Sequence, residues 1–223
     1  MHVAIIPDGN RRWARERGLR STEGHRVAYE RAFDLAEYAA TKGVRYLTFY
    51  AFSTENWKRA KDEVGFLFSL LERFVGGEVR RMHERGMRIR FIGSQEGISR
   101  KLLERMRLTE ELTVGNTGMM LNIAFNYGGR RDLTEAVAAI VREGVKADDV
   151  TEQVIAAHLS TRGTPPVDLV IRTSGQLRLS NYLLWEANYA ELIFLDMYWP
   201  DFGREQLDQA LAEFAARQRR YGA

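Results

Sequence analysis

Six short apolar runs alternate along the chain with longer stretches of helical periodicity, and this alternation constrains the fold more than any other feature. The strand-like runs cover residues 3–6, 45–52, 87–93, 119–125, 167–171 and 192–195. Strands that alternate with helices are typical of a parallel sheet with helices on its faces. We therefore expect an α/β fold with one domain over residues 1–223, built on a mostly parallel central sheet of about six strands flanked by helices.

The stretches between the strands carry apolar residues at helical spacing. They cover residues 25–42, 61–85, 99–113, 131–143, 150–159 and 203–220. The first half of 61–85 is apolar nearly all round, because Phe66, Phe68 and Leu70 lie outside its main apolar face. A helix of this kind is buried on both sides. It either belongs to the core or also lines an apolar channel for a ligand, and the sequence leaves both interpretations open.

Composition limits the classes of function. The 223 residues contain no cysteine, which excludes disulfides, thiolate nucleophiles and cysteine-based zinc sites. The four histidines show no metal-ligand spacing, and no run approaches the roughly 18 apolar residues of a membrane span. A net charge of +3 suits an anionic ligand, and we expect no nucleic-acid partner. Because the chain shows no signal segment, we expect a cytoplasmic protein.

The most informative polar segment follows the first strand. Pro7 ends strand pairing, Asp8 and Gly9 form a turn with Asn10, and two arginines open a helical segment. Glycine lets backbone N–H groups approach a phosphate, and Mg²⁺ usually binds one or two carboxylates plus substrate phosphates. These residues therefore indicate a magnesium–diphosphate site. The alternative is an ordinary Asp-Gly-Asn turn beside solvated arginines.

Three further polar segments follow later strands, at residues 53–59, 126–130 and 172–180. In a parallel sheet the carboxyl ends of the strands share one edge, where ligands bind in open α/β folds. We therefore expect this edge to collect Asp8, Arg11, Arg12, Ser53, Glu55, Asn56, Arg59, Arg130, Arg172, Arg178 and Ser180. One guanidinium group can bind two phosphate oxygens at once. Because several such groups gather at this edge, the expected ligand carries more than one phosphate group.

Several long motifs resemble those of a known family. They are His2-Val-Ala-Ile-Ile-Pro-Asp-Gly-Asn-Arg-Arg-Trp-Ala14, Gly24-His25, Tyr50-Ala-Phe-Ser-Thr-Glu-Asn-Trp-Lys-Arg59, Phe125-Asn-Tyr-Gly-Gly-Arg130, Asp168-Leu-Val-Ile-Arg-Thr-Ser-Gly175, Arg178-Leu-Ser-Asn-Tyr-Leu-Leu-Trp185, Tyr189-Ala-Glu-Leu192 and Trp199-Pro-Asp-Phe202. In this order they resemble the cis-prenyltransferases, typified by undecaprenyl diphosphate synthase. The resemblance implies that isopentenyl diphosphate is condensed repeatedly onto an allylic diphosphate, such as farnesyl diphosphate, and that each new double bond is cis.

The resemblance also implies roles for individual residues. Asp8 matches the catalytic and Mg²⁺-binding aspartate, Asn56 matches a residue that takes part in proton removal, and Glu191 matches a second Mg²⁺-linked carboxylate. The allylic diphosphate would contact Gly9, Asn10, Arg11, Arg12, Trp13, Ser21 and His25, under a flexible segment that holds Ser53, Thr54, Glu55, Trp57 and Arg59. The isopentenyl diphosphate would contact Arg172, Arg178, Leu179 and Ser180. The motif Arg220–Gly222 would reach the other subunit's site, which implies a homodimer.

Some of these residues also have simpler explanations. His25 could pack or cap the start of a helix, Trp13 and Trp57 could belong to the core, and Glu55 could be a surface charge or an arginine's partner. The chain also departs from the family pattern at Arg11, Ser21, Ala28, Gln176 and Leu177. These departures concern the fine geometry of the diphosphate pocket, and hence substrate preference and rate.

The resemblance favours a long product such as undecaprenyl diphosphate, the lipid carrier for cell-wall synthesis, partly because Ala51 is small. The growing chain requires an apolar tunnel, and the helix after the second strand is a candidate wall. The product would pass to the membrane, so we also expect peripheral association with its inner face. The alternatives are a short-chain or branching synthase and a non-catalytic partner subunit.

Overall fold

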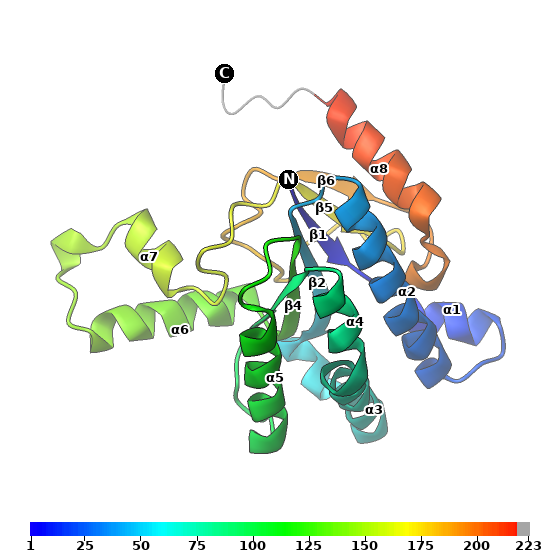
Figure 1. Cartoon of the computed structure of the whole chain (residues 1–223), viewed down its shortest axis with the longest axis horizontal. Coiled ribbons are helices and arrows are strands. Elements are labelled where there is room, and N and C mark those ends of the chain that lie inside the picture. The colour runs from blue at the N-terminus through cyan, green and yellow to red at the C-terminus, as the bar shows by residue number, and fades with distance from the viewer. Residues whose placement is uncertain (218–223) are drawn as a thin grey trace.

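Six strands form one sheet in the order β3-β4-β2-β1-β5-β6, and every neighbouring pair is parallel (Figure 1). The computed structural model describes residues 1–217. The strands are β1 His2–Ile6, β2 Tyr46–Ser53, β3 Arg88–Ile92, β4 Met120–Tyr127, β5 Leu169–Arg172 and β6 Glu191–Phe194. This arrangement confirms the α/β fold that the sequence predicts, and each predicted strand lies within two residues of an observed one.

The helices occupy the predicted stretches. They are α1 Asn10–Glu16, α2 Ser21–Thr41, α3 Lys61–Arg73, α4 Val79–Glu84, α5 Arg100–Thr113, α6 Gly129–Arg142, α7 Glu152–His158 and α8 Arg204–Ala216. Single turns occur at η1 Thr54–Lys58, η2 Phe74–Glu78, η3 Ala147–Asp149 and η4 Trp199–Asp201. The predicted C-terminal helix, 203–220, extends past the described residues. No helix within residues 1–217 has the length and apolar character needed to cross a membrane.

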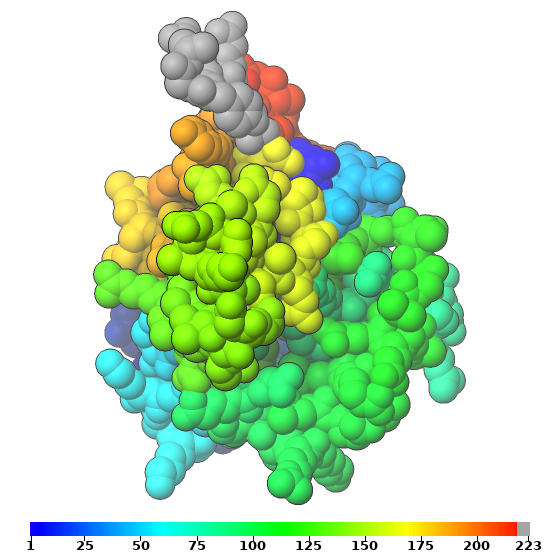
Figure 2. Space-filling model, turned by 90° about the vertical axis from the view of Figure 1, so that its left-hand side faces the viewer, coloured from blue at the N-terminus to red at the C-terminus, as the bar shows by residue number. Residues whose placement is uncertain are grey.

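The two faces of the sheet are covered differently. Helices α2 to α5 lie over one face with α8 beside α2, while α6 and α7 extend to one side (Figure 1). Alternate strand residues such as Val3, Ile5 and Leu47 meet these helices in the larger core. On the opposite face, Ala4 and Ile6 pack against the segment that contains Tyr182 and Leu183. Figure 2 views the molecule from the side of α6 and α7, which form its front in yellow-green.

One predicted helix is interrupted. The stretch 61–85 is helical from Lys61 to Glu84, which confirms the predicted helix, but a π-helical turn, η2, separates α3 from α4. The interruption contains Gly76 and Gly77. Glycine weakens a regular helix because it gains no side-chain contacts and loses the most backbone freedom. π-Turns often lie at functional sites, and this one begins at Phe74, in the wall of a cavity.

That cavity lies between α2, α3 and the sheet, and its volume is about 790 Å³. Its polar mouth is at the carboxyl edge of the strands, and its inner wall is apolar. The inner wall consists of Ala28, Tyr29, Ala32 and Phe33 from α2, Leu67, Leu70, Leu71 and Phe74 from α3 and η2, and Phe49, Ala51, Leu121, Ile123 and Phe125 from the sheet. Of the two interpretations of the apolar helix, α3 therefore fits the one in which it lines a channel.

Candidate active site

The site is built where the central strands end. Asp8 is the second residue after β1, and Arg172 is the last residue of β5, which pairs with Ile6 of β1. The next residue, Thr173, ties the two strand ends together, because its hydroxyl accepts from the backbone N–H of Asp8 at 3.0 Å and donates to the carbonyl of Asp8 at 2.7 Å. The parallel register thus places a carboxylate and a guanidinium side by side.

Gly9 makes the turn from β1 to α1 possible. Its φ is 101°, a left-handed conformation that side chains disfavour, and a Cβ there would lie 2.5 Å from Cδ1 of Tyr198. The missing side chain at Gly9 therefore lets Tyr198, the residue before η4, pack closely over the loop. In return, the N–H of Gly9 donates to Oδ1 of Asp8 at 2.7 Å.

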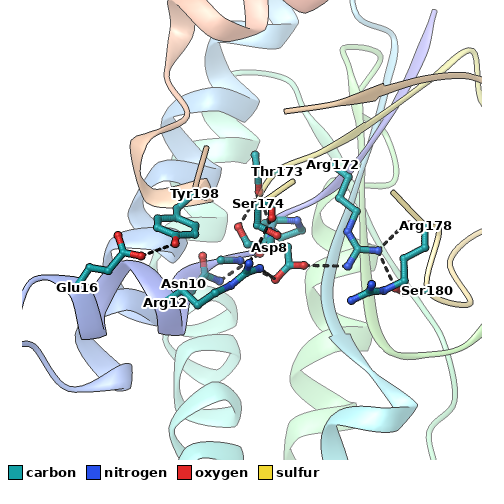
Figure 3. A network of polar contacts seen from close by, with 12 residues as sticks. Asp8, Asn10, Arg12, Glu16, Arg172, Thr173, Ser174, Arg178, Ser180 and Tyr198 are labelled. Atoms are coloured by element: carbon teal, nitrogen blue, oxygen red, sulfur yellow. Dashed lines mark hydrogen bonds and ion pairs between the residues drawn. The ribbon is translucent and has the colours of Figure 1, made fainter. Parts of the chain in front are cut away.

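Asp8 and Arg172 form the charged centre of the site (Figure 3). Nη2 of Arg172 donates to Oδ2 of Asp8 at 2.8 Å, and Nη2 of Arg12 lies 3.6 Å from Oδ1. Partial burial by itself raises the pKa of Asp8, but the hydrogen bond and positive charge of Arg172 outweigh it, and the pKa is lowered. Asp8 is therefore ionised at neutral pH, with about a third of its side chain exposed to receive a ligand.

Arg172 also holds the loop that follows β5. Its Nη1 donates to Oγ of Ser180 at 2.7 Å and to the carbonyl of Arg178, while Arg172 itself is 4% exposed. The loop is unusual because Ser174, Ser180 and two later residues have positive φ without being glycine. Backbone strain of this kind clusters at functional sites. Three of the predicted contacts for isopentenyl diphosphate, Arg172, Arg178 and Ser180, are thus brought together next to Asp8.

Most residues predicted to bind the allylic diphosphate line the mouth of the cavity. They are Asp8, Gly9, Asn10, Arg11, Arg12, Ser21, His25, Asn56 and Arg59. They come from the loop after β1, the start of α2 and the segment after β2. The sheet edge therefore opens directly into the apolar cavity.

Glu63, on the first turn of α3, is the site residue that sequence reasoning missed. It is 6% exposed, and its Oε1 lies 3.0 Å from Nε2 of His25 and 2.9 Å from Nη1 of Arg59. Burial raises the pKa of Glu63, but His25 and the charges of Arg59 and Arg11 outweigh it and the pKa is lowered. Its spacing of four residues from Arg59, the geometry of a helical ion pair, was the available signal.

The segment from Ser53 to Arg59 crosses the mouth as the single turn η1. The Oδ1 of Asn56 accepts from the N–H of Ser53 at 3.1 Å, which leaves the amide nitrogen for a ligand. Glu55 accepts from Asn181 at 2.9 Å, and Trp57 donates to Asn126 at 2.7 Å. Trp57 is 41% exposed, so it is not a core residue. Ser53, Thr54, Glu55 and Trp57 lie beside the cavity wall rather than in it.

Several predicted residues lie elsewhere. Trp13 points away from the cavity and donates to Asp201 at 2.7 Å. Leu179 packs into the smaller core behind the sheet. Arg130 follows the carboxyl end of β4, at the predicted edge of the sheet, but it is exposed and does not line the cavity. The motif Arg220–Gly222 lies outside the described residues.

Glu191 is also separate from Asp8 within the chain. It begins β6 and therefore lies at the amino end of the strands, whereas Asp8 lies past their carboxyl ends. Its carboxylate pairs with Arg217 at 2.8 Å. The structure of one chain thus does not bring the two predicted Mg²⁺ ligands together.

The donor set at Asp8 fits a magnesium ion held jointly with a substrate. Within residues 1–217, no group of three or more histidine, aspartate or glutamate side chains is placed to hold a metal. Mg²⁺ does not need such a cage, since it keeps several waters and binds one or two carboxylates plus phosphate oxygens. One ionised, partly exposed carboxylate beside arginines meets that requirement.

Comparison with known proteins agrees with this geometry. Residues 6–222 match the family model described as "Putative undecaprenyl diphosphate synthase". The isoprenyl transferase of Neisseria meningitidis serogroup B is 45% identical over 99% of this chain and 88% of its own length. The Vibrio vulnificus ditrans,polycis-undecaprenyl-diphosphate synthase, named as (2E,6E)-farnesyl-diphosphate specific, is 41% identical over 99% and 90%.

A solved structure is similar throughout. The lavandulyl diphosphate synthase of Lavandula x intermedia, in complex with dimethylallyl diphosphate, superposes with a TM-score of 0.95 at 36% identity, over 100% of this chain and 98% of its own. The family model and the identities over nearly the full chain agree with the site, in which a cationic mouth suited to a diphosphate opens into an apolar cavity. The chain therefore belongs to the undecaprenyl diphosphate synthase family and is a cis-prenyltransferase.

Proposed function

We propose that this enzyme extends an allylic diphosphate, farnesyl diphosphate, with successive isopentenyl diphosphate units to give a long polyprenyl diphosphate such as undecaprenyl diphosphate. The observation that carries the proposal is the cavity of about 790 Å³, which runs from the arginines at Asp8 to the aromatic wall at Phe33 and Phe74. This volume is near the upper end of the usual range for ligand pockets, about 300–1,000 Å³. An apolar interior under a cationic mouth fits a hydrocarbon that carries a diphosphate.

The mouth residues can stabilise the charge that develops in the reaction. When the bond between C1 of the allylic group and its diphosphate oxygen breaks, negative charge grows on the leaving group. Arg11, Arg12 and Arg59 line the place where that group would lie, and fixed donors at a developing charge are usually the largest catalytic contribution. Mg²⁺ held by Asp8 would neutralise further diphosphate charge.

The second substrate would bind beside the first. Arg172, Ser180 and Arg178 form a group next to Asp8, and Arg172 is fixed by its hydrogen bonds before any ligand arrives. Isopentenyl diphosphate held there would present its double bond to the allylic C1, so both diphosphates would be positioned around one carboxylate. Such positioning turns a reaction between two molecules into a reaction within one complex.

Asn56 would serve the proton-loss step. A carboxamide does not titrate near neutral pH, so it acts by holding a proton acceptor or the substrate in place. Its oxygen is already bonded to Ser53, and its nitrogen is available to donate to a diphosphate oxygen. We also propose that the enzyme is a homodimer completed by Arg220–Gly222, that Glu191 contributes to Mg²⁺ binding, and that the product passes to the inner face of the membrane.

A short-chain or branching synthase is the second candidate function. The high structural similarity to lavandulyl diphosphate synthase favours it. Tyr29 and Phe33 in the cavity wall also narrow the space available to a long hydrocarbon product. Product length separates this candidate from the long-chain synthase directly.

The test is product analysis with competing primers. The purified protein is incubated with radiolabelled isopentenyl diphosphate, Mg²⁺ and either dimethylallyl, geranyl or farnesyl diphosphate, and the products are separated by chain length. We expect farnesyl diphosphate to be preferred and long products to accumulate. Products of one or two added units would favour the short-chain candidate instead.

Asp8→Ala supplies the matching control. Removing this carboxylate leaves the buried Arg172 without its charged partner and removes the proposed Mg²⁺ ligand, so turnover should fall by about a hundredfold or more. Full retention of turnover by Asp8→Ala would reject the mechanism. Absence of any product from the unaltered protein with every primer would support a non-catalytic role.

A further inference from the structure

The loop at residues 126–130 follows β4 and reaches the same edge of the sheet as the site described above. The sequence predicts that it contributes a phosphate-binding arginine, yet Arg130 does not line the cavity. The loop instead lies against the segment from Ser53 to Arg59, which crosses the mouth. Two separate ties join them, one through Asn126 and one through Gly128 and Arg130.

Asn126 forms the first tie. It is 1% exposed and has a φ of 52°, in the left-handed region, although it is not glycine. Its Nδ2 donates to the carbonyls of Ser94 and Glu96, both at 2.9 Å, and its Oδ1 accepts from Nε1 of Trp57 at 2.7 Å. Carbonyls only accept and an indole N–H only donates, so these partners permit a single orientation of the amide.

Trp57 is held by packing as well as by that bond. Its ring lies edge-on to Phe52 at 5.5 Å and against Phe68 at 5.2 Å between centroids. Gly97 also lies close to the ring, since a Cβ there would be 3.2 Å from Cζ2 of the indole. Although Trp57 is 41% exposed, its ring is held by contacts with Phe52, Phe68 and Gly97, and its Nε1 is bonded to the buried amide of Asn126.

The second tie restrains the start of the same segment. Asn181 accepts from the backbone N–H of Arg130 through Oδ1 and donates to Oε1 of Glu55 through Nδ2, each at 2.9 Å. A Cβ on Gly128 would lie 2.6 Å from the hydroxyl of Thr54, so the glycine leaves room for the segment to approach. Asn56 stands between Glu55 and Trp57, and it is the residue of this turn that lines the cavity.

We propose that Asn126 is a positioning residue that fixes Asn56 over the cavity through its hydrogen bond to Trp57. Asn126 touches neither the cavity nor the expected substrates, so it acts through the position of η1. The proposal rests on the proposed function for the role of Asn56. The physical attachment of η1 to the loop can be tested independently of activity.

Two variants remove the bond from opposite sides. Asn126→Gly deletes the amide and keeps the left-handed backbone, which glycine adopts without strain. Trp57→Phe deletes the indole N–H and keeps an aromatic ring against Phe52 and Phe68. The control is Asn116→Ala, which deletes another side-chain amide bonded to a backbone carbonyl, at Met87, away from the site.

The first measurement is limited trypsin digestion, followed by mass spectrometry of the peptides cut after Lys58 and Arg59. Local opening exposes a segment to protease. We expect Trp57→Phe to speed these two cleavages about two- to tenfold, the range that loss of one hydrogen bond allows. Asn126→Gly, which also loses the bonds to Ser94 and Glu96, should speed them at least as much, with Asn116→Ala unchanged. Equal cleavage rates in folded Asn126→Gly and the unaltered chain would reject the attachment.

The second measurement is steady-state kinetics with a double-mutant cycle. Each variant should lower kcat about two- to tenfold with a smaller change in KM. The double variant should lose little more than Asn126→Gly alone, because the bond that Trp57→Phe removes is already missing there. Additive losses, or an equal loss in Asn116→Ala, would reject the positioning role. If the unaltered chain shows no turnover, the proposed function fails, while the digestion result still decides whether the attachment exists.

Discussion

At the scale of single residues, the site depends on a few buried charges that each satisfy several partners. Arg172 connects Asp8 to Ser180, and Glu63 connects His25 to Arg59. Both are less than 10% exposed. Removing one partner of a buried, hydrogen-bonded charge leaves the others unpaired, and this costs more than an exposed ion pair contributes.

Glu63→Gln should therefore weaken both substrate binding and the fold. We expect KM for the allylic diphosphate to rise several-fold, because His25 and Arg59 lose the negative charge of their common partner, and the free energy of unfolding to fall by about 2 kcal/mol at pH 7. Enzyme kinetics and urea unfolding measure the two effects. Glu30→Gln, in an exposed pair with Arg26, is the control and should change neither.

The stability effect of Glu63 should depend on pH in one direction. Because the pKa of Glu63 is lower in the folded chain, its contribution is complete above about pH 4.5, the ordinary value, and is lost as the pH falls below it. The difference between the unaltered chain and Glu63→Gln should shrink in urea unfolding at pH 4 relative to pH 7. A difference that grows at low pH would contradict this assignment.

At the scale of elements, the channel results from how three elements meet. Helix α2 contributes small residues and two aromatics, α3 contributes leucines, and β2 contributes Ala51 at a point where its pairing with β4 is shifted. Such irregularities re-aim side chains. The π-turn η2 then places Phe74 in the wall, stacked on Phe33 at 5.1 Å.

Ala51→Leu should shorten the product. The added atoms would enter a channel that Ala51 leaves open, and because Ala51 is exposed within it, the core would be little disturbed. We expect the chain-length distribution to shift by at least one isoprene unit, as measured by chromatography of labelled products. Ala157→Leu, an exposed position on α7, is the matched control. An unchanged distribution would show that the chain does not pass Ala51.

At the scale of the whole molecule, the two faces of the sheet differ in chemistry. One face encloses the channel, while the other holds a buried acid pair, Asp132 and Glu186, each 6% exposed. Ser160 donates its N–H to Asp132, and Thr161 donates its hydroxyl to Glu186. Burial raises the pKa of both carboxyls. The charge of Glu135 raises the pKa of Asp132 further, and the charge of Asp132 raises the pKa of Glu186.

Glu186→Gln should make the protein more stable at alkaline pH. A carboxyl whose pKa is raised on folding is harder to ionise in the folded chain, so stability falls as the pH rises above about 4.5. The amide accepts from Thr161 without carrying charge. Urea unfolding at pH 8 should show a gain of about 1 kcal/mol, and the gain should disappear near pH 4. Glu84→Gln, an exposed change, should show no such trend.

Much of this protein could be predicted from the sequence. Apolar runs of four to eight residues, separated by helical periodicity, were enough to predict six strands, because both patterns arise from local chain geometry. The polar segments after the strands were predictable for the same reason, since a parallel sheet sends all carboxyl ends to one edge. Asp8, Asn56 and Arg172 could thus be identified as candidate site residues, whereas His25 became one only through the resemblance to the family.

The tertiary structure alone decided how these segments are used. Only packing shows that Asn126 contacts Trp57 of η1, that Glu63 joins His25 to Arg59, and that Glu191 lies far along the strands from Asp8. The open channel is likewise a property of three elements together, since α3 has the same apolar sequence whether it faces core or cavity. Local patterns determine which side chains can reach an edge or a face, whereas contacts between distant segments determine what each side chain meets there.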